Sequence, residues 1–255
     1  MPPRMRLDAL LVERRLADTR ARARALVLGG HVTVGGAVVS KAGAPTAPDA
    51  DIALSTPDHP YVGRGGIKLA HALDVFGLDV TGKVALDIGA STGGFTDAML
   101  QRGAQHVVAL DVGHAQLAWK IRQDARVTVL EGINARTLDG HMLPSPTRTF
   151  DLITVDVSFI SLKMIVSRLP PLLQEDGHIV VLVKPQFEAE RSEIGKKGVV
   201  RDPVVRQRVV DDVAAVANAL GLKPAGTTPS PITGAEGNQE VLLHLVPSMN
   251  HRASP

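Results

Sequence analysis

The chain has 255 residues, of which 44% are hydrophobic and 3% aromatic, and its net charge is only +2, so it can bury one large core or two unequal ones. The absence of cysteine excludes disulfides, thiolate zinc sites and a cysteine nucleophile. No stretch is apolar enough for a membrane span or a secretory signal, and we therefore expect a soluble cytoplasmic protein.

Basic residues are concentrated near the N-terminal end of the chain. Residues 1–41 contain eight Lys and Arg against three acidic residues, a net charge of +5, whereas residues 61–255 carry 20 of each sign. A basic segment joined to a neutral remainder suggests a nucleic-acid-binding region attached to another domain. The alternative is a solvated helix face that happens to be basic.

The N-terminal part predicts two short helices and a hairpin. The first helix is indicated by leucines at helical spacing, Leu7, Leu10, Leu11 and Leu16. Asp18 and Thr19 can cap a second helix over residues 20–28. Alternating valines before Gly35-Gly36 indicate a hairpin, and residues 42–60 predict one short strand at most and a connection between domains.

This part resembles the S-four-type RNA-binding domain, named after a protein of the small ribosomal subunit. The resemblance is carried by "RLDALLVERRLADTRARARALVLGGHVTVGGAVVSK". It implies basic helix residues that lie along RNA phosphates and recognise shape more than base sequence. The residues expected to contact RNA are Arg4, Arg6, Arg20, Arg24, Lys41 and Arg64.

Beyond residue 60, strands and helices alternate. Strands are predicted over 83–89, 106–112, 126–132, 150–158, 178–185, 222–228 and 240–246. Helices are predicted over 65–77, 92–103, 115–124, 161–173 and 202–221, the last with Asp202 as its cap and Pro203 in its first turn. The pattern predicts an α/β fold, a mostly parallel seven-stranded Rossmann-like sheet covered on both faces, preceded by a small α+β domain.

The predicted domains are an RNA-binding domain over 1–58, a linker over 59–64, a cofactor-binding domain over 65–248 and a disordered tail over 249–255. The charged stretch 188–203 predicts a mobile loop over the active site, with Lys196, Lys197 and Arg201 able to meet phosphate. Trp119 suggests base stacking, but its spacing from Leu117 and Ile121 favours partial packing against the sheet.

The first strand of the sheet runs into a glycine-rich turn, "LDIGASTGGFTD", which lets a ligand approach the backbone and the start of a helix. Asp111, twenty-two residues past Gly89, ends the next strand and can accept two ribose hydroxyls. The glycine spacing is not that of dinucleotide enzymes, and no phosphate-binding Lys-Ser/Thr pair follows. A purely structural tight turn is the alternative.

The form Asp-x-Gly-x-x-x-Gly-Gly, with an acid closing the next strand, resembles the S-adenosylmethionine site of class I methyltransferases. The resemblance also implies that Asn134, after the third strand, holds the adenine edge. No metal is expected. The residues expected to bind the cofactor are Asp87, Gly89, Ala90, Ser91, Gly93, Gly94, Phe95, Asp111, Val112, Asn134 and Ala135.

Four polar residues at strand ends or edges are the candidates for catalysis. Asp156 and Lys184 end the fourth and fifth strands, and the carboxyl ends of parallel strands face the ligand crevice. Glu240 opens the last strand, and Lys68 lies in the helix before the sheet. Taken singly, Lys184 can reach solvent past the strand end, Asp156 can cap a helix, and the others can be surface charges.

This Lys-Asp-Lys-Glu set resembles that of the FtsJ-type ribose 2′-O-methyltransferases, in which a 2′-hydroxyl attacks the sulfonium methyl. Lys184 is the leading candidate for the base, because desolvation and the second cation Lys68 would destabilise its ammonium form. Asp156 and Glu240 would orient the lysines and the hydroxyl. Which lysine loses its proton stays open.

The two halves together resemble the TlyA family of rRNA methyltransferases, also labelled hemolysins. The motifs are "YVGRGGIKL", "LDIGASTGGFTD", "LDVGHAQLAWKIRQD", "DVSFISL", "LVKPQFE", "KGVVRDP" and "GNQEVLLHL". The resemblance implies S-adenosylmethionine-dependent 2′-O-methylation of cytidine in rRNA, on both ribosomal subunits in some members and on the large subunit only in others. The alternatives are a non-catalytic rRNA-binding factor, a membrane-active hemolysin and, more distantly, a nicotinamide oxidoreductase.

Two positions depart from that family. Gly63 in "VGRGG" stands where many relatives have serine, and the linker reads "HPYV", with Tyr61 in place of a tryptophan. The resemblance therefore does not extend to coupling between the domains through this linker.

Overall fold

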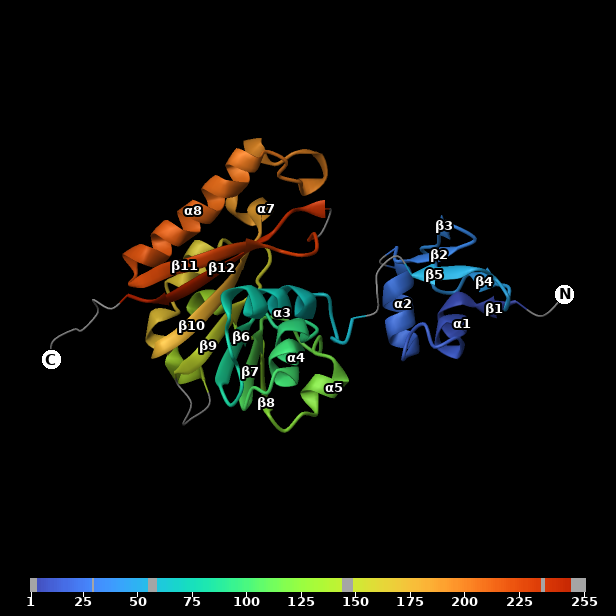
Figure 1. Ribbon diagram of the computed structural model, residues 1–255, viewed down its shortest axis with the longest axis horizontal. Helices are drawn as coiled ribbons and strands as arrows, with labels where there is room; N and C mark the ends of the chain where they lie inside the picture. The colour runs from blue at the N-terminus through green and yellow to red at the C-terminus, as the bar shows by residue number, and fades with distance from the viewer. Residues whose placement is uncertain (1–3, 29, 55–58, 144–148, 235–236, 249–255) are drawn as a thin grey trace. The chain divides into compact units, whose positions relative to one another are not determined.

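The computed structural model describes residues 4–28, 30–54, 59–143, 149–234 and 237–248 (Figure 1). The chain divides into two compact units, Met1–Pro60 and Tyr61–Pro255. The division falls within the stretch 59–64 that the sequence assigns to a linker, and the predicted domain bounds stay a prediction. The predicted disordered tail, 249–255, lies outside the described residues.

The first unit packs two helices, α1 (Leu7–Glu13) and α2 (Arg20–Leu28), against small sheets. As predicted, the second helix begins after Thr19, whose Oγ1 accepts a hydrogen bond from the Arg22 amide at 3.1 Å. The predicted hairpin forms between β2 (Val32–Val34) and β3 (Ala37–Val38), with positive φ at Gly35 and Gly36.

The expectation of at most one strand in residues 42–60 is wrong. β4 (Pro45–Thr46) pairs with β1 (Met5–Arg6), and β5 (Ile52–Leu54) pairs with β2. Both strands are two or three residues long and are held by partners distant in sequence. This stretch is therefore part of the first unit.

The second unit is built on a seven-stranded sheet in the order β11-β12-β10-β9-β6-β7-β8. The strands are β6 (Val84–Ile88), β7 (His106–Asp111), β8 (Val127–Glu131), β9 (Phe150–Val155), β10 (Leu173–Val183), β11 (Leu222–Pro229) and β12 (Val241–Pro247). Only the pairings of β12, with β10 and with β11, are antiparallel. The predicted mostly parallel α/β sheet is confirmed.

Alternate residues of each strand point to opposite faces of this sheet, and both faces are apolar. Helices therefore cover both faces. In β6, Leu86 and Ile88 pack in one hydrophobic cluster and Ala85 in the other. The side of Ala85 holds α3 (Gly65–Phe76), α4 (Gly94–Gln101) and α5 (Trp119–Arg122). The other side holds α6 (Leu162–Val166) and α8 (Pro203–Ala219), and α7 (Pro185–Glu188) follows β10.

Two predicted helices are shorter than expected. The helix predicted over 161–173 ends at Val166, and Pro170–Leu172 forms a separate 3₁₀ turn, because the two prolines cannot continue an α-helix. The helix predicted over 115–124 has only four residues. Trp119 is 73% exposed, whereas Ile121 in the same helix and Leu117 before it are buried, so the expected partial packing of Trp119 against the sheet is wrong.

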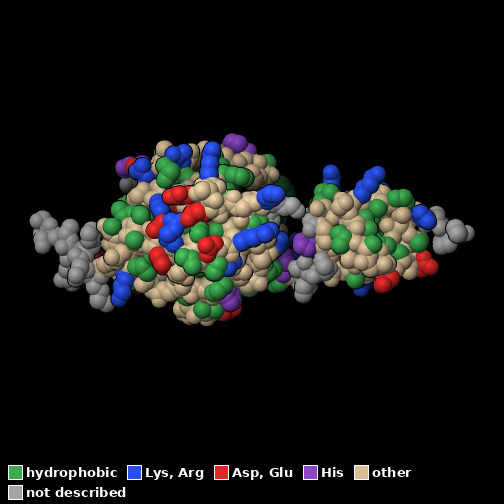
Figure 2. Space-filling model, turned by 90° about the horizontal axis from the view of Figure 1, so that it is seen from above, with side chains coloured by type: hydrophobic (Ala, Val, Ile, Leu, Met, Phe, Trp, Pro, Cys, Tyr) green, Lys and Arg blue, Asp and Glu red, His purple; other side chains and the backbone are tan. Residues whose placement is uncertain are grey.

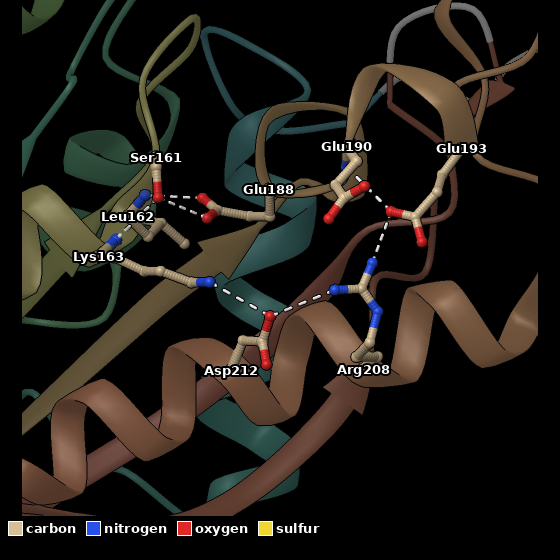
Figure 3. Close-up of polar contacts among 8 residues, drawn as sticks. All are labelled: Ser161, Leu162, Lys163, Glu188, Glu190, Glu193, Arg208 and Asp212. Atoms are coloured by element: carbon tan, nitrogen blue, oxygen red, sulfur yellow. Dashed lines mark hydrogen bonds and ion pairs between the residues drawn. The ribbon is translucent and has the colours of Figure 1, made fainter.

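The charged stretch 188–203 contains short 3₁₀ turns, Arg191–Glu193 and Lys196–Gly198, and an ion pair between Glu193 and Arg208 attaches it to α8 (Figure 3). Arg208 pairs with Glu193 and, at 3.5 Å, with Asp212, which also accepts from Lys163 at 3.2 Å. Figure 2 shows basic and acidic side chains intermingled on one face of this unit. Movement of the stretch over the site stays a prediction.

Among the described residues, no helix is long and apolar enough to cross a membrane.

Candidate active site

The glycine loop joins the end of β6 to the start of α4. The amides of Gly89 and Ala90 donate to the Leu110 carbonyl at 2.8 and 3.1 Å, which turns the chain sharply. Gly89 has a φ of +86°, and a Cβ there would lie 2.9 Å from the Asp156 carbonyl carbon and closer still to its oxygen. Only glycine fits this position, because the ends of β6 and β9 meet there.

Asp111 holds the loop from the neighbouring strand. Its two carboxylate oxygens accept hydrogen bonds from the Ser91 and Gly113 amides, both at 2.7 Å. A cavity of about 470 Å³ opens beside this carboxylate, with residues 156–160 on its other side. The predicted cofactor residues that line it are Gly89, Ser91, Asp111, Val112, Asn134 and Ala135.

A second cavity, of about 200 Å³, shares walls with the first. Three further predicted cofactor residues line it, Ala90, Gly94 and Phe95. Gly65, Asp156, Ser158 and Lys184 also border it. The two cavities share Gly89, Ser91, Asp156 and Ser158 in their walls, and we call these adjoining cavities the hollow. The glycine loop and the predicted catalytic residues Asp156 and Lys184 therefore face this hollow at the carboxyl ends of the central strands.

Asp87 and Gly93 are not among the described residues that line these two cavities. Asp87 is fully buried, and the hydroxyls of Thr96 and Thr154 donate to its carboxylate at 2.6 and 3.0 Å. Burial raises the pKa of this carboxyl to about 6, and the negative charge of Asp156 acts in the same direction. The prediction that Asp87 contacts a cofactor is not supported by this geometry, because its carboxylate is directed into the core, where it positions the loop.

Replacing Asp87 by asparagine is expected to change the pH dependence of stability. The folded pKa of about 6 lies above the ordinary 3.8, so the protonated carboxyl stabilises the fold below pH 3.8 and this contribution is lost as the pH rises to 6. Urea unfolding from pH 4 to 7 should show the wild type losing about 2 kcal/mol relative to the variant. A difference that is the same at every pH would contradict this.

The four predicted catalytic residues form two ion pairs at the same edge of the sheet. Lys184 Nζ lies 2.6 Å from Asp156 Oδ1 and donates to Ser158 Oγ at 3.0 Å. Lys68 pairs with Glu240, and both are buried. Val183 is the register partner of Val241, which brings the adjoining Lys184 and Glu240 to neighbouring positions.

The two pairs differ in access. The side chains of Lys184 and Asp156 are 11% and 20% exposed and border the smaller cavity. Lys68 and Glu240 are not among the described residues that line the larger or the smaller cavity. Lys184 and Asp156 can therefore reach a group in the smaller cavity, whereas Lys68 and Glu240 are buried outside it.

Two residues of the loop after Asp156 were not among the predicted site residues. Ser158 borders both cavities, and Phe159 borders the larger one. Phe159 is 90% exposed, has a φ of +64°, and its ring centroid lies 5.2 Å from that of Phe187. An exposed aromatic ring on strained backbone is a mark of function. The residue types of Ser158 and Phe159 carried no signal that separates them from ordinary loop residues.

The residues predicted to bind RNA are all exposed on their own units. Arg6 is bonded to Asp8 at 3.0 and 2.7 Å, and Arg20 lies 3.5 Å from the same carboxylate. Arg64 belongs to the second unit and donates to the Thr233 carbonyl at 2.8 Å. Their roles in RNA binding stay predictions.

The two positions that depart from the TlyA pattern lie against the glycine loop and the helices around it. The Tyr61 ring lies over Gly66, where a Cβ would collide with it, and the Val62 amide donates to Asp97 in α4 at 2.8 Å. A Cβ at Gly63 would lie 2.5 Å from Thr92 Oγ1. A serine at position 63 would therefore require Thr92 to move.

Comparisons with known proteins agree with this architecture. The FtsJ-like methyltransferase model matches residues 61–246, and the S4 domain model matches residues 5–50. The chain is 46% identical to "Putative rRNA methyltransferase YqxC" of Bacillus subtilis, over 94% of this chain and 85% of the relative.

It is 44% identical to "16S/23S rRNA (cytidine-2′-O)-methyltransferase TlyA" of Mycobacterium tuberculosis, over 96% of this chain and 91% of the relative. Among solved structures, "Putative hemolysin from Streptococcus thermophilus" is similar with a TM-score of 0.75 and 41% identity, covering 98% of this chain and 90% of that one.

Proposed function

We propose a function for this chain, which belongs to the FtsJ-like methyltransferase family and to its TlyA branch and carries an N-terminal S4 domain. It transfers a methyl group from S-adenosylmethionine to a cytidine ribose 2′-hydroxyl in rRNA. The observation that carries the proposal is the Lys184–Asp156 pair, which borders the same hollow as the glycine loop. The cytidine and the rRNA come from the name of the mycobacterial relative.

The hollow fits this cofactor. The larger cavity is of the size that small-molecule sites have, and it combines a backbone approach at Gly89 with the strand-end carboxylate of Asp111. Val112, Asn134 and Ala135 would enclose the adenosine end, and the loop up to Phe95 would enclose the amino-acid end. When bound, S-adenosylmethionine supplies an electrophilic methyl group on its sulfonium.

Lys184 is the group that we assign as the base. A neutral amine at Nζ can accept the proton of a ribose hydroxyl that enters the smaller cavity, and Asp156 at 2.6 Å holds the amine in place. The charge of Lys68 is compensated by Glu240, so we assign this buried pair to positioning α3 against β12 next to Lys184.

The S4 domain would bring the RNA to this site. Its exposed basic residues, Arg4, Arg6, Arg20, Arg24 and Lys41, would contact phosphates, which makes binding strongly dependent on salt. Ribosomal subunits, the large one and in addition the small one, are the candidate substrates, and the cytoplasm is then the site of action.

The test is transfer of labelled methyl groups from S-adenosylmethionine to purified large and small ribosomal subunits that lack the modification. Label in rRNA of either subunit is expected. Cofactor binding without any transfer would favour the non-catalytic rRNA-binding factor, and lysis of cells by the pure protein with no transfer would favour a membrane-active hemolysin.

Replacing Phe159 by alanine is expected to raise the KM for ribosomal subunits about tenfold, because an exposed ring at the cavity can stack on the target base. Thermal stability should not fall, since the side chain is almost fully exposed. Steady-state kinetics check this, with Phe159→Tyr expected near the wild type. Trp119→Ala, an exposed aromatic outside both cavities, is the matched control. An unchanged KM for Phe159→Ala would rule out the stacking role.

A further inference from the structure

Lys184 Nζ has two partners, and both belong to the loop that follows β9. Asp156 Oδ1 lies at 2.6 Å and Ser158 Oγ at 3.0 Å. Ser158 is exposed, and among the described residues its hydroxyl has no other hydrogen-bond partner. A serine whose hydroxyl contacts only the proposed base calls for a role in the reaction.

We propose that Ser158 is a positioning residue that fixes the direction of the lone pair on Lys184. The inference rests on the proposed function, in which neutral Lys184 takes a proton from the ribose hydroxyl. It adds a requirement that the Lys-Asp-Lys-Glu set does not contain, namely a hydrogen-bond acceptor for the amine of Lys184, because the 2.6 Å contact with Asp156 is an ion pair without hydrogen-bond geometry.

The stereochemistry of a primary amine supplies the reason. A neutral lysine amine has two N–H bonds and one lone pair, arranged tetrahedrally with the bond to Cε. Ser158 Oγ accepts one hydrogen, and the carboxylate charge of Asp156 at 2.6 Å repels the lone pair, so the lone pair takes the position that faces neither residue. Asp156 Oδ1 makes no hydrogen bond to Nζ, so with Asp156 alone the amine can turn about its bond to Cε and place a hydrogen where the lone pair is needed. Ser158 therefore selects the productive rotamer of the amine.

The loop that carries Ser158 is held from both ends. The Asp156 amide donates to the Ile88 carbonyl at 2.9 Å. At the other end, the carboxylate of Glu188 accepts from Ser161 Oγ and from the Leu162 amide, both at 2.7 Å (Figure 3). Glu188 stands four residues after Lys184, so it joins the loop to the segment that carries the base.

The local environment supports a fixed loop. Glu188 is largely removed from solvent, and burial raises its pKa. Phe159, directly after Ser158, has a φ of +64°, a conformation that a non-glycine residue keeps only when its surroundings impose it. These constraints maintain the 3.0 Å contact between Ser158 and Lys184.

Methyl transfer to ribosomal subunits by Ser158→Ala tests the inference. Losing this hydrogen bond is expected to lower kcat about tenfold, while the KM for S-adenosylmethionine and for the subunits stays at the wild-type value. Ser158→Thr, which keeps a hydroxyl, should restore most of kcat. Ser167→Ala removes another exposed serine hydroxyl, one that donates to the Met164 carbonyl, and should have no effect.

The outcomes separate this inference from the proposed function. A wild-type kcat in Ser158→Ala would overturn the inference alone, as would equal losses in Ser158→Ala and Ser158→Thr, which would mean that the hydroxyl is not what matters. A rise in KM at constant kcat would assign Ser158 to substrate binding and also overturn it. No transfer by the wild-type protein would overturn the proposed function, and the inference with it.

Discussion

Replacing Lys184 by alanine is expected to lower kcat for methyl transfer about a thousandfold, which is the usual contribution of a general base. Its amine is the basic group at the border of the smaller cavity and lies 2.6 Å from Asp156. S-adenosylmethionine affinity, measured by calorimetry, should change little, because Lys184 is not among the residues that we propose to enclose the cofactor. Lys184→Met, which keeps the length of the apolar stem, should show the same loss.

The matched control is Lys223→Ala, which removes an exposed lysine at the edge strand β11 and should leave kcat unchanged. Asp156→Asn should also be slow, because it weakens the contact that orients the amine. Transfer by Lys184→Ala at more than a tenth of the wild-type rate would move the base to another group.

Replacing Gly89 by alanine is expected to abolish measurable cofactor binding and to lower activity on the order of a hundredfold or more. The new methyl group would overlap the backbone of Asp156, so the loop that carries Asp156 and Ser158 must move. The positive φ of +86° adds about 1 kcal/mol of strain. Calorimetric titration with S-adenosylmethionine and the thermal midpoint together measure the two effects.

Gly82→Ala separates strain from overlap. Gly82 also has a positive φ, +70°, but a Cβ there would meet nothing within 4 Å. This variant should lose about 1 kcal/mol of stability and keep full cofactor binding and activity. If Gly89→Ala and Gly82→Ala behaved alike, the close approach at Gly89 would have no role in the site.

The elements that the sequence predicted correctly are those with strong local signals. Thr19 and Asp202 cap the helices that they were predicted to cap, and their side chains accept hydrogen bonds from the Arg22 and Val204 amides. The apolar strands of the large sheet were equally clear. In contrast, β4 and β5 depend on partners far along the chain, and no local pattern in residues 42–60 shows them.

For the site, the strand ends could be predicted because topology brings them to one edge of the sheet. The two ion pairs, Lys184 with Asp156 and Lys68 with Glu240, could not be predicted, because they depend on distances between side chains. The sequence also did not show that Asp87 is buried, which keeps its carboxylate out of the cavity. Ser158 and Phe159 were missed because nothing in their residue types distinguishes them from ordinary loop residues.

The most direct test of the central claim is where the methyl group lies on the RNA. Labelled rRNA from the wild-type reaction is hydrolysed with alkali, which cannot cleave the chain after a 2′-O-methylated nucleotide because the 2′-oxygen is blocked. Label in alkali-stable dinucleotides that begin with cytidine, and none with Lys184→Ala, is the expected result. Label in mononucleotides would place the methyl on a base and contradict the assignment of a ribose 2′-O-methyltransferase.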